Sequence, residues 1–119
     1  MKGEVEDLRS RTKKFALRII RLYSSLSKQT LPQVLGKQLL RSGTSAGANY
    51  REGFRSRSKA EFLAKMGDCL KELEETAYWL ELFCEGNILE KNRLSPIMNE
   101  CNQLISIFVT IIKRCRNNS

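Results

Sequence analysis

The chain has 119 residues, of which 41% are hydrophobic and 29% charged, and its formal net charge is +8. This length suits one domain, residues 1–119, with a modest core. No apolar stretch follows the first residues, so we expect no signal peptide. The most apolar stretch, residues 104–112, is shorter than the roughly 20 residues that span a bilayer. We therefore expect a cytoplasmic protein that does not bind a membrane.

The positive charge is concentrated in the first half of the chain. Residues 1–60 hold 14 Lys or Arg and 4 Asp or Glu, whereas residues 61–119 hold 7 and 9. A basic half of this size predicts a polyanionic partner, either nucleic acid or an anionic membrane surface, and of the two we expect nucleic acid. The alternative is a basic face that is merely solvated.

The sequence contains four cysteines and no histidine. Cys69, Cys84, Cys101 and Cys115 form no closely spaced pair, whereas zinc sites usually draw on paired Cys and His ligands. All four fall at apolar positions of a helical pattern. We therefore expect buried, reduced thiols, no metal and no cofactor.

Apolar residues recur every three or four positions, which is the spacing of one helix face. The stripe of the first segment consists of Leu8, Thr12, Phe15, Ile19, Leu22 and Leu26. That of the second consists of Leu31, Leu35, Leu39, Ser42, Ala46 and Asn49. No segment alternates with the period of a strand. The pattern predicts four helices, at residues 5–27, 31–54, 58–86 and 93–116.

Residues typical of helix ends mark these boundaries. Pro32 and Pro96 fall in the predicted first turns of the second and fourth helices, where the missing N–H costs little. Ser58, with a glutamate three residues later, forms a capping box for the third helix, and Gly86-Asn87 ends it. Because the connections are short, we expect an all-α, antiparallel up-down-up-down four-helix bundle.

The fourth helix is apolar almost all round between Leu104 and Ile112. A helix in a four-helix monomer needs only one buried stripe. The surplus indicates either that this helix contacts a second subunit or that it is the central helix of the monomer.

Residues 43–47, Gly-Thr-Ser-Ala-Gly, match the Gly-x-Ser-x-Gly string of hydrolases. A nucleophile elbow needs a preceding strand and a base, usually histidine. This chain offers neither, and Lys37 and Lys59 do not stand at a spacing typical of a Ser–Lys pair. The glycines also fail to match a phosphate-binding loop. We therefore expect no catalytic residue and no enzymatic activity.

The same small residues suit close packing on the second helix. Glycine inside a helix costs about 1 kcal/mol relative to alanine. This cost indicates that a neighbouring helix or a bound partner needs the space. The residues assigned to packing are Ser42, Gly43, Ala46, Gly47 and Asn49.

In such a bundle, the start of the first helix, the turn after the second and the end of the fourth share one end. Arg9 and Lys13 belong to this basic end, and Arg11, Lys14, Arg18 and Arg21 form a stripe along the first helix. Many arginines favour bidentate phosphate contacts. The residues predicted to contact nucleic-acid phosphates are Arg11, Lys14, Arg18, Arg21, Arg51, Arg55, Arg57, Lys59, Lys113, Arg114 and Arg116.

Arg41 has a different expected role. It lies opposite residue 71 in the bundle, so Glu72 and Glu75 are close enough to form a partly buried ion pair that fixes helix register. Tyr78 and Trp79 are expected in the core or in an interface. They form no aromatic ladder of the kind that binds single strands.

Three stretches of the sequence form a recognisable pattern: Leu31-Pro32, residues 38–52 (QLLRSGTSAGANYRE), and residues 58–62 (SKAEF) with 70–80. In these stretches the sequence resembles the bacterial four-helix bundle proteins encoded in intervening sequences of 23S ribosomal RNA genes. The resemblance implies a small basic bundle without known catalysis. The family is related to accessory proteins of diversity-generating retroelements, which form pentameric rings, bind nucleic acid and associate with a reverse transcriptase. The resemblance thus implies a homopentamer.

We therefore expect a non-enzymatic, oligomeric protein that binds nucleic acid, RNA rather than DNA, through its basic end. The alternative is a protein-interaction scaffold that docks a reverse transcriptase or another acidic protein without binding RNA itself.

Overall fold

The computed structural model describes the backbone of residues 2–118 and the side chains of residues 8–118. Within these limits the chain forms α1 (Lys2–Ser24), α2 (Thr30–Gly53), α3 (Lys59–Glu85) and α4 (Lys91–Asn117). All four predicted helices are present, and their ends lie within 3 residues of the predicted positions. The described residues contain no strand.

The third helix has the predicted signals at both ends, with two local differences. The Ser58 hydroxyl accepts the Glu61 N–H at 3.1 Å. The Glu61 carboxylate accepts the N–H of Arg57 at 2.6 Å, one residue before the partner of a standard capping box. At the other end, Asn87 rather than Gly86 adopts the left-handed conformation, with φ 57°. An asparagine tolerates this conformation better than most residues.

The two prolines differ in their positions. Pro32 lies in the first turn of α2, as predicted. Pro96 lies in the second turn of α4, because this helix begins at Lys91 rather than near Arg93. The N-cap residue, Glu90, makes no side-chain cap hydrogen bond. The true start of α4 therefore carries none of the residues that usually mark a helix beginning.

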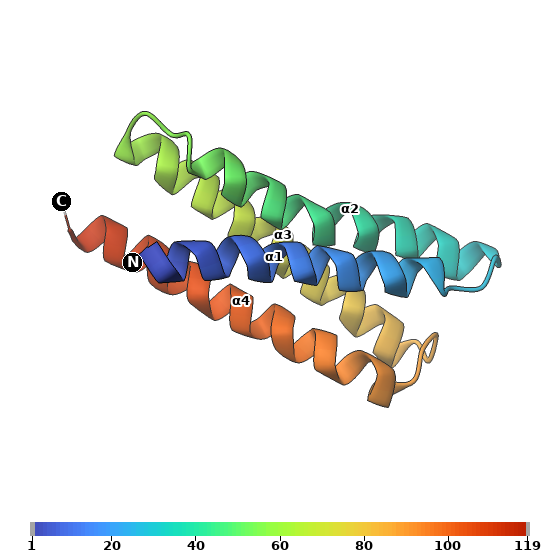
Figure 1. Ribbon diagram of the computed structural model, residues 1–119. Helices are drawn as coiled ribbons and strands as arrows, with labels where there is room; N and C mark the ends of the chain where they lie inside the picture. The colour runs from blue at the N-terminus through green and yellow to red at the C-terminus, as the bar shows by residue number, and fades with distance from the viewer. Residues whose placement is uncertain (1, 119) are drawn as a thin grey trace.

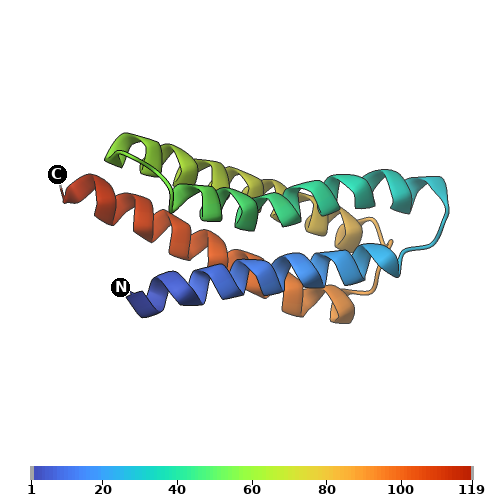
Figure 2. The ribbon, with the colours of Figure 1, turned by 45° about the horizontal axis from the view of Figure 1, so that its top comes forward.

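The helices are arranged side by side, and the segments expected to share one end lie together. Figures 1 and 2 show both chain termini and the α2–α3 turn at one end, and the other two connections at the opposite end. The molecule is 49 Å long and 21 by 20 Å across. Among the helix pairs that pack together, α2 and α3 share the most extensive contact and α1 and α4 the least extensive. No helix among the described residues is both long and apolar enough to cross a membrane.

One cluster of buried side chains from all four helices forms the core. The six-residue stripe predicted for α1 is buried along its whole length. The stripe predicted for α2 is partly wrong, because Leu31 is 58% exposed. The buried face of α2 instead includes Gly36, Gly43 and Gly47, because α2 turns these residues toward α1.

The cysteines divide into two kinds. Cys69 and Cys101 are buried, and burial raises the pKa of each thiol to about 12. Cys84 and Cys115 are only partly buried, so the prediction of four buried thiols is wrong for these two. They lie near the ends of α3 and α4, where neighbouring helices cover less of the surface. All four thiols are free.

Three glycines allow α1 to approach α2 closely. An added Cβ at Gly36 would lie 2.6 Å from Leu26 Cδ1, and one at Gly43 would lie 2.8 Å from Ile19 Cγ1. At Gly47 the nearest atom would be Thr12 Oγ1 at 3.2 Å. These distances are below ordinary van der Waals contact. Side chains of α1, and that of Leu26 two residues after it, therefore occupy the space that side chains on α2 would need.

Gly43→Ala is expected to lower the free energy of unfolding by about 1 kcal/mol. Overpacking against the fully buried Ile19 costs about 1–3 kcal/mol, which outweighs the gain in helix propensity of about 1 kcal/mol. Urea unfolding followed by circular dichroism measures the difference.

The matched control is Gly67→Ala in α3, because an added Cβ at Gly67 meets no atom within 4 Å. This variant should be stabilised by up to about 1 kcal/mol. Equal stabilisation of both variants would show that α1 does not need the space at Gly43.

Candidate nucleic-acid interface

Most of the predicted phosphate contacts are exposed at the end that holds the termini and the α2–α3 turn. They belong to the last turn of α2, the turn that follows, the start of α3 and the end of α4. These exposed residues are Arg51, Arg55, Arg57, Lys59, Lys113, Arg114 and Arg116. The last turn of α2, the turn that follows, the start of α3 and the end of α4 therefore all bring positive charge to this end.

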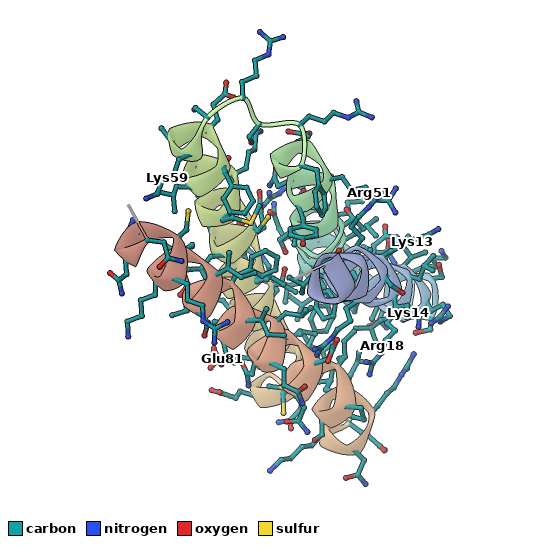
Figure 3. The ribbon with its side chains drawn as sticks, turned by 60° about the vertical axis from the view of Figure 1, so that its left-hand side comes forward. Lys13, Lys14, Arg18, Arg51, Lys59 and Glu81 are labelled. Carbon is teal, nitrogen blue, oxygen red and sulfur yellow. The ribbon has the colours of Figure 1, made fainter. Side chains whose placement is uncertain are left out.

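The predicted cations do not form one continuous patch. Figure 3 shows Lys59 on the opposite side of this end from Arg51, Lys13 and Lys14. Lys14 is exposed and Arg18 partly buried on α1. Arg21 lies in the last turn of α1, toward the opposite end of the bundle. A ligand on the Arg51 side would therefore leave Lys59 free.

Arg11 is engaged within the bundle. Its Nη2 lies 2.7 Å from Glu100 Oε1, and its Nε lies 3.1 Å from Glu100 Oε2. Nη2 also donates to Gln103 Oε1 at 3.2 Å. Both charged side chains are largely shielded, with exposed fractions of 25% and 20%. This bidentate pair joins α1 to α4, and because the Arg11 guanidinium is already held by Glu100, Arg11 is not one of the phosphate contacts proposed below.

Arg41 joins α2 to α3. Its Nη2 lies 2.5 Å from Glu75 Oε1, and its Nη1 lies 3.3 Å from Glu72 Oε1. The hydrogen bond from Arg41 lowers the pKa of Glu75, and the same bond raises the pKa of Arg41. Arg41 is half-exposed, so the pair is less buried than the sequence predicted.

The Gly-x-Ser-x-Gly string lies entirely within α2. The Ser45 hydroxyl donates to the Arg41 carbonyl at 2.6 Å, one helical turn earlier. The hydroxyls of Ser42 and Thr76 lie 2.8 Å apart in the buried contact between α2 and α3, where Ala46 is also buried. Asn49 is only partly buried. The string therefore lacks the strand and sharp turn of a nucleophile elbow, and its residues pack against α1 and α3.

The structure assembles a cationic cluster between α1 and α2 that the sequence analysis did not single out. Three open hollows follow one another along this seam. The first, of about 280 Å³, is lined by Thr12, Lys13, Ala16, Thr44, Gly47, Ala48 and Arg51. The second is lined by Arg9, Ser10, Lys13 and Arg51. The third, of about 350 Å³, is lined by Arg9, Arg51, Glu52, Phe54 and Arg55. We call this surface the basic groove.

The basic groove is strongly positive. Among the side chains that the structure describes, Glu52 is the one carboxylate that lines the groove. It lies 2.6 Å from Lys65 Nζ, and this hydrogen bond raises the pKa of Lys65. Among the side chains of residues 8–118, no carboxylate forms an ion pair with Lys13, Arg51 or Arg55. Unpaired cations on both walls of a groove favour a bound anion.

The comparisons with known proteins identify the family. The model of the 23S rRNA-intervening sequence protein family matches residues 6–110. This chain belongs to that family. It is also similar to the crystal structure of a protein of unknown function from the S23 ribosomal protein family of Bacteroides thetaiotaomicron. The two chains are 36% identical, the match covers 88% of this chain and 97% of the other, and the TM-score is 0.82. No curated protein matches the chain.

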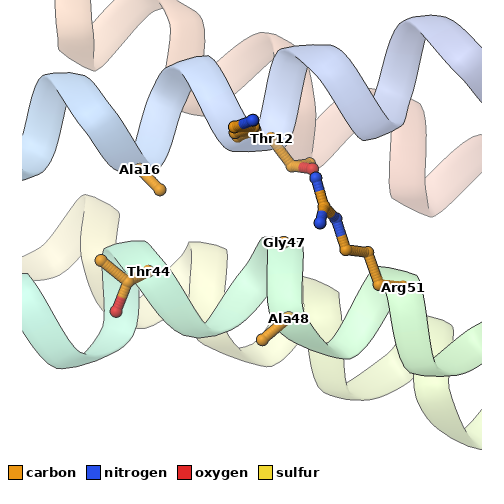
Figure 4. Close-up of a pocket in the computed structure, with 7 residues that line it drawn as sticks. Thr12, Ala16, Thr44, Gly47, Ala48 and Arg51 are labelled. Atoms are coloured by element: carbon orange, nitrogen blue, oxygen red, sulfur yellow. The ribbon is translucent and has the colours of Figure 1, made fainter.

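The glycine contacts explain how this 23S rRNA-intervening sequence family member forms the basic groove. Gly47 faces Thr12, which is followed directly by Lys13. Arg51 comes one helical turn after Gly47, on the same face of α2. Figure 4 shows the Arg51 side chain extending from α2 toward α1 beside Thr12. The contact at Gly47 therefore sets Lys13 and Arg51 on facing walls.

The sequence places Arg9 and Lys13 at the basic end, but not among the predicted phosphate contacts. Those contacts on α1 belong to the stripe of Arg11, Lys14 and Arg18, each of which lies one position before a core residue. The four-residue spacing of Gly47 and Arg51 is the signal that could have indicated Arg9 and Lys13. Residues four apart share a helix face, so Arg51 lies on the face of α2 that the close-packing glycine turns toward α1. Among the described residues, no cluster of His, Cys, Asp and Glu could hold a metal ion.

Glu75→Gln is expected to lower the free energy of unfolding by several tenths of a kcal/mol near neutral pH, as for other exposed ion pairs. The pKa of Glu75 is lowered in the folded protein. The pair therefore stabilises the fold above the unfolded-state pKa of about 4.3, and its contribution is lost as pH falls through the folded-state value. Urea midpoints near neutral pH and at about pH 3 measure this change.

Glu74→Gln is the control, because Glu74 is exposed and forms none of the ion pairs among the described side chains. It should leave the midpoint almost unchanged at both pH values. A difference between wild type and Glu75→Gln that persists undiminished in acid would contradict a charge-based contribution of this pair.

Proposed function

We propose that this protein is non-enzymatic and binds structured RNA through phosphate contacts in the basic groove. The observation that supports the proposal is the groove itself, where Arg9, Lys13, Arg51 and Arg55 line adjoining hollows. The carboxylate of Glu52, which also lines the groove, is already held by Lys65. Guanidinium and ammonium groups are the usual donors to phosphate oxygens. The net charge of +8 supports the same kind of partner.

The other exposed cations would extend this contact rather than form it. Lys14 and Arg18 lie on the same side of the molecule as Arg51 in Figure 3 and would follow an RNA backbone along α1. Arg57, Lys59 and the basic end of α4 would contact a longer or folded RNA. The basic groove is thus the central site, and the other cations are peripheral. The peripheral cations contribute to RNA affinity through counterion release alone.

The proposal also includes an antiparallel up-down-up-down bundle that assembles into a homo-oligomer in the cytoplasm, a pentamer by family resemblance. Large apolar side chains outside the core support assembly, since exposed apolar surface often marks protein contacts. They are Leu17, Ile20, Leu31, Val34, Tyr78 and Val109. Val109 lies on α4, the helix with surplus apolar residues.

A protein-interaction scaffold is the second candidate, and the exposed apolar residues favour it as well. In that case the cations would dock an acidic protein, such as a reverse transcriptase, without intrinsic RNA binding. Competition distinguishes the two functions. Generic RNA should displace such a partner if the basic groove binds RNA, and should leave the complex intact if it does not.

RNA affinity is expected to fall steeply as salt concentration rises, because phosphate contacts release counterions. Lys13→Ala should weaken binding about tenfold and reduce the slope of log affinity against log salt by about 0.7–0.9. Fluorescence anisotropy with a labelled RNA hairpin over a salt series measures both quantities.

Lys28→Ala is the matched control, because it removes the same charge from the α1–α2 connection at the opposite end. It should change neither the affinity nor the slope appreciably. A flat salt response of the wild type, or equal losses in the two variants, would rule out the basic groove as the RNA site.

Light scattering of the purified protein is expected to give a mass several times the 13.7 kDa of one chain. Val109→Glu, which places a charge on the exposed face of α4, should reduce this mass if α4 lies in the interface. Glu74→Gln serves again as a surface control. A wild type that is monomeric at all concentrations would refute the proposed assembly.

A further inference from the structure

Phe54 lines the basic groove but has no role in binding a phosphate. It caps the end of α2 and is 42% exposed, although it is a large apolar residue. The buried Tyr50 supports it, with ring centroids 4.9 Å apart in an edge arrangement. Tyr50 in turn contacts the core residue Phe108 in the same way, at 5.6 Å. The chain of rings fixes Phe54 at the rim of the core.

The ring of Phe54 already carries a flat, charged group. The guanidinium carbon of Arg9 lies over the ring, 5.5 Å from its centroid. Guanidinium groups and nucleobases both stack on aromatic rings, the first by cation–π attraction and the second by π-stacking. A ring that accepts Arg9 in this way therefore presents a surface on which a nucleobase fits.

We propose that Phe54 is a stacking platform for an unpaired nucleobase, and that the phosphate of the same nucleotide binds between Arg9, Lys13 and Arg51. This inference rests on the proposed function and specifies its ligand. The base occupies the place of the Arg9 guanidinium, which turns to the phosphate.

The layout of the groove supports this division of one nucleotide. The hollow that contains Phe54 adjoins the hollow lined by Arg9, Ser10, Lys13 and Arg51. Arg9 and Arg51 line both hollows. A short movement of Arg9 therefore exchanges its contact with the Phe54 ring for a contact with the phosphate. Base and phosphate of a single nucleotide can thus be held by neighbouring hollows.

The ligand must be unpaired, because the bases inside a duplex are stacked on each other on both faces and cannot cover an external ring. Duplex RNA would contact the same cations through its phosphates alone. The groove should therefore bind loops and single strands more tightly than a duplex of the same charge. Structured RNA presents such nucleotides in its loops and bulges.

The test compares a short single-stranded RNA with the blunt duplex of the same sequence, each titrated by anisotropy over a salt series. Phe54→Leu should weaken single-strand binding about tenfold, since stacking contributes roughly 1–3 kcal/mol per base. It should leave duplex binding within about twofold and leave the salt slope unchanged, because stacking releases no counterions. Phe54→Tyr, which keeps the ring, should retain single-strand affinity.

The ratio of the two affinities keeps the test valid if Phe54→Leu lowers the folded fraction, because a loss of fold reduces both affinities equally. Equal effects of Phe54→Leu on single strand and duplex, or none on either, would overturn the stacking platform. Salt-dependent binding by the wild type would in that case still support the proposed function. If the wild type binds neither RNA, the proposed function and this inference both fail.

Discussion

Because glycine has no side chain, Gly36, Gly43 and Gly47 let α1 lie directly against α2. The space that larger residues would fill holds Leu26, Ile19 and Thr12. This contact carries a conformational cost, because glycine is a poor helix former. It also fixes the rotation of α2, whose glycines face α1. Ser42 and Ala46 are then left for α3. The packing of three helices thus depends on one face of α2.

The same contact decides which cations are available. Arg11, Arg41 and Lys65 are held by carboxylates across the α1–α4 and α2–α3 seams. At the α1–α2 seam, glycines replace such pairs, and among the side chains of residues 8–118 no carboxylate forms an ion pair with Lys13 or Arg51. Cations are therefore neutralised at the seams where ion pairs bridge the helices. They stay available to a ligand at the seam where the helices meet through small residues. The basic groove is a consequence of that difference.

Family membership establishes the fold of this protein more firmly than its activity. The structural neighbour is itself described as a protein of unknown function, and one fold can serve many functions. RNA binding is therefore inferred from local chemistry, namely from facing cations and an exposed ring supported by the core. A serine in a hydrolase-like string carries no comparable argument, because its hydroxyl is bonded to the helix backbone.

The sequence by itself determined the four helices, the Ser58 cap and the buried stripe of α1, because periodicity and capping act within a few residues of the chain. It also placed Arg41 opposite Glu72 and Glu75, since short turns fix which residues of neighbouring helices meet. Only the tertiary structure decided that Leu31 is exposed, that Arg11 is paired, and that Arg9 lies on Phe54. These three features depend on how helices distant in sequence are rotated and spaced. The close contact at the α2 glycines sets that rotation and spacing, and no local sequence pattern contains this information.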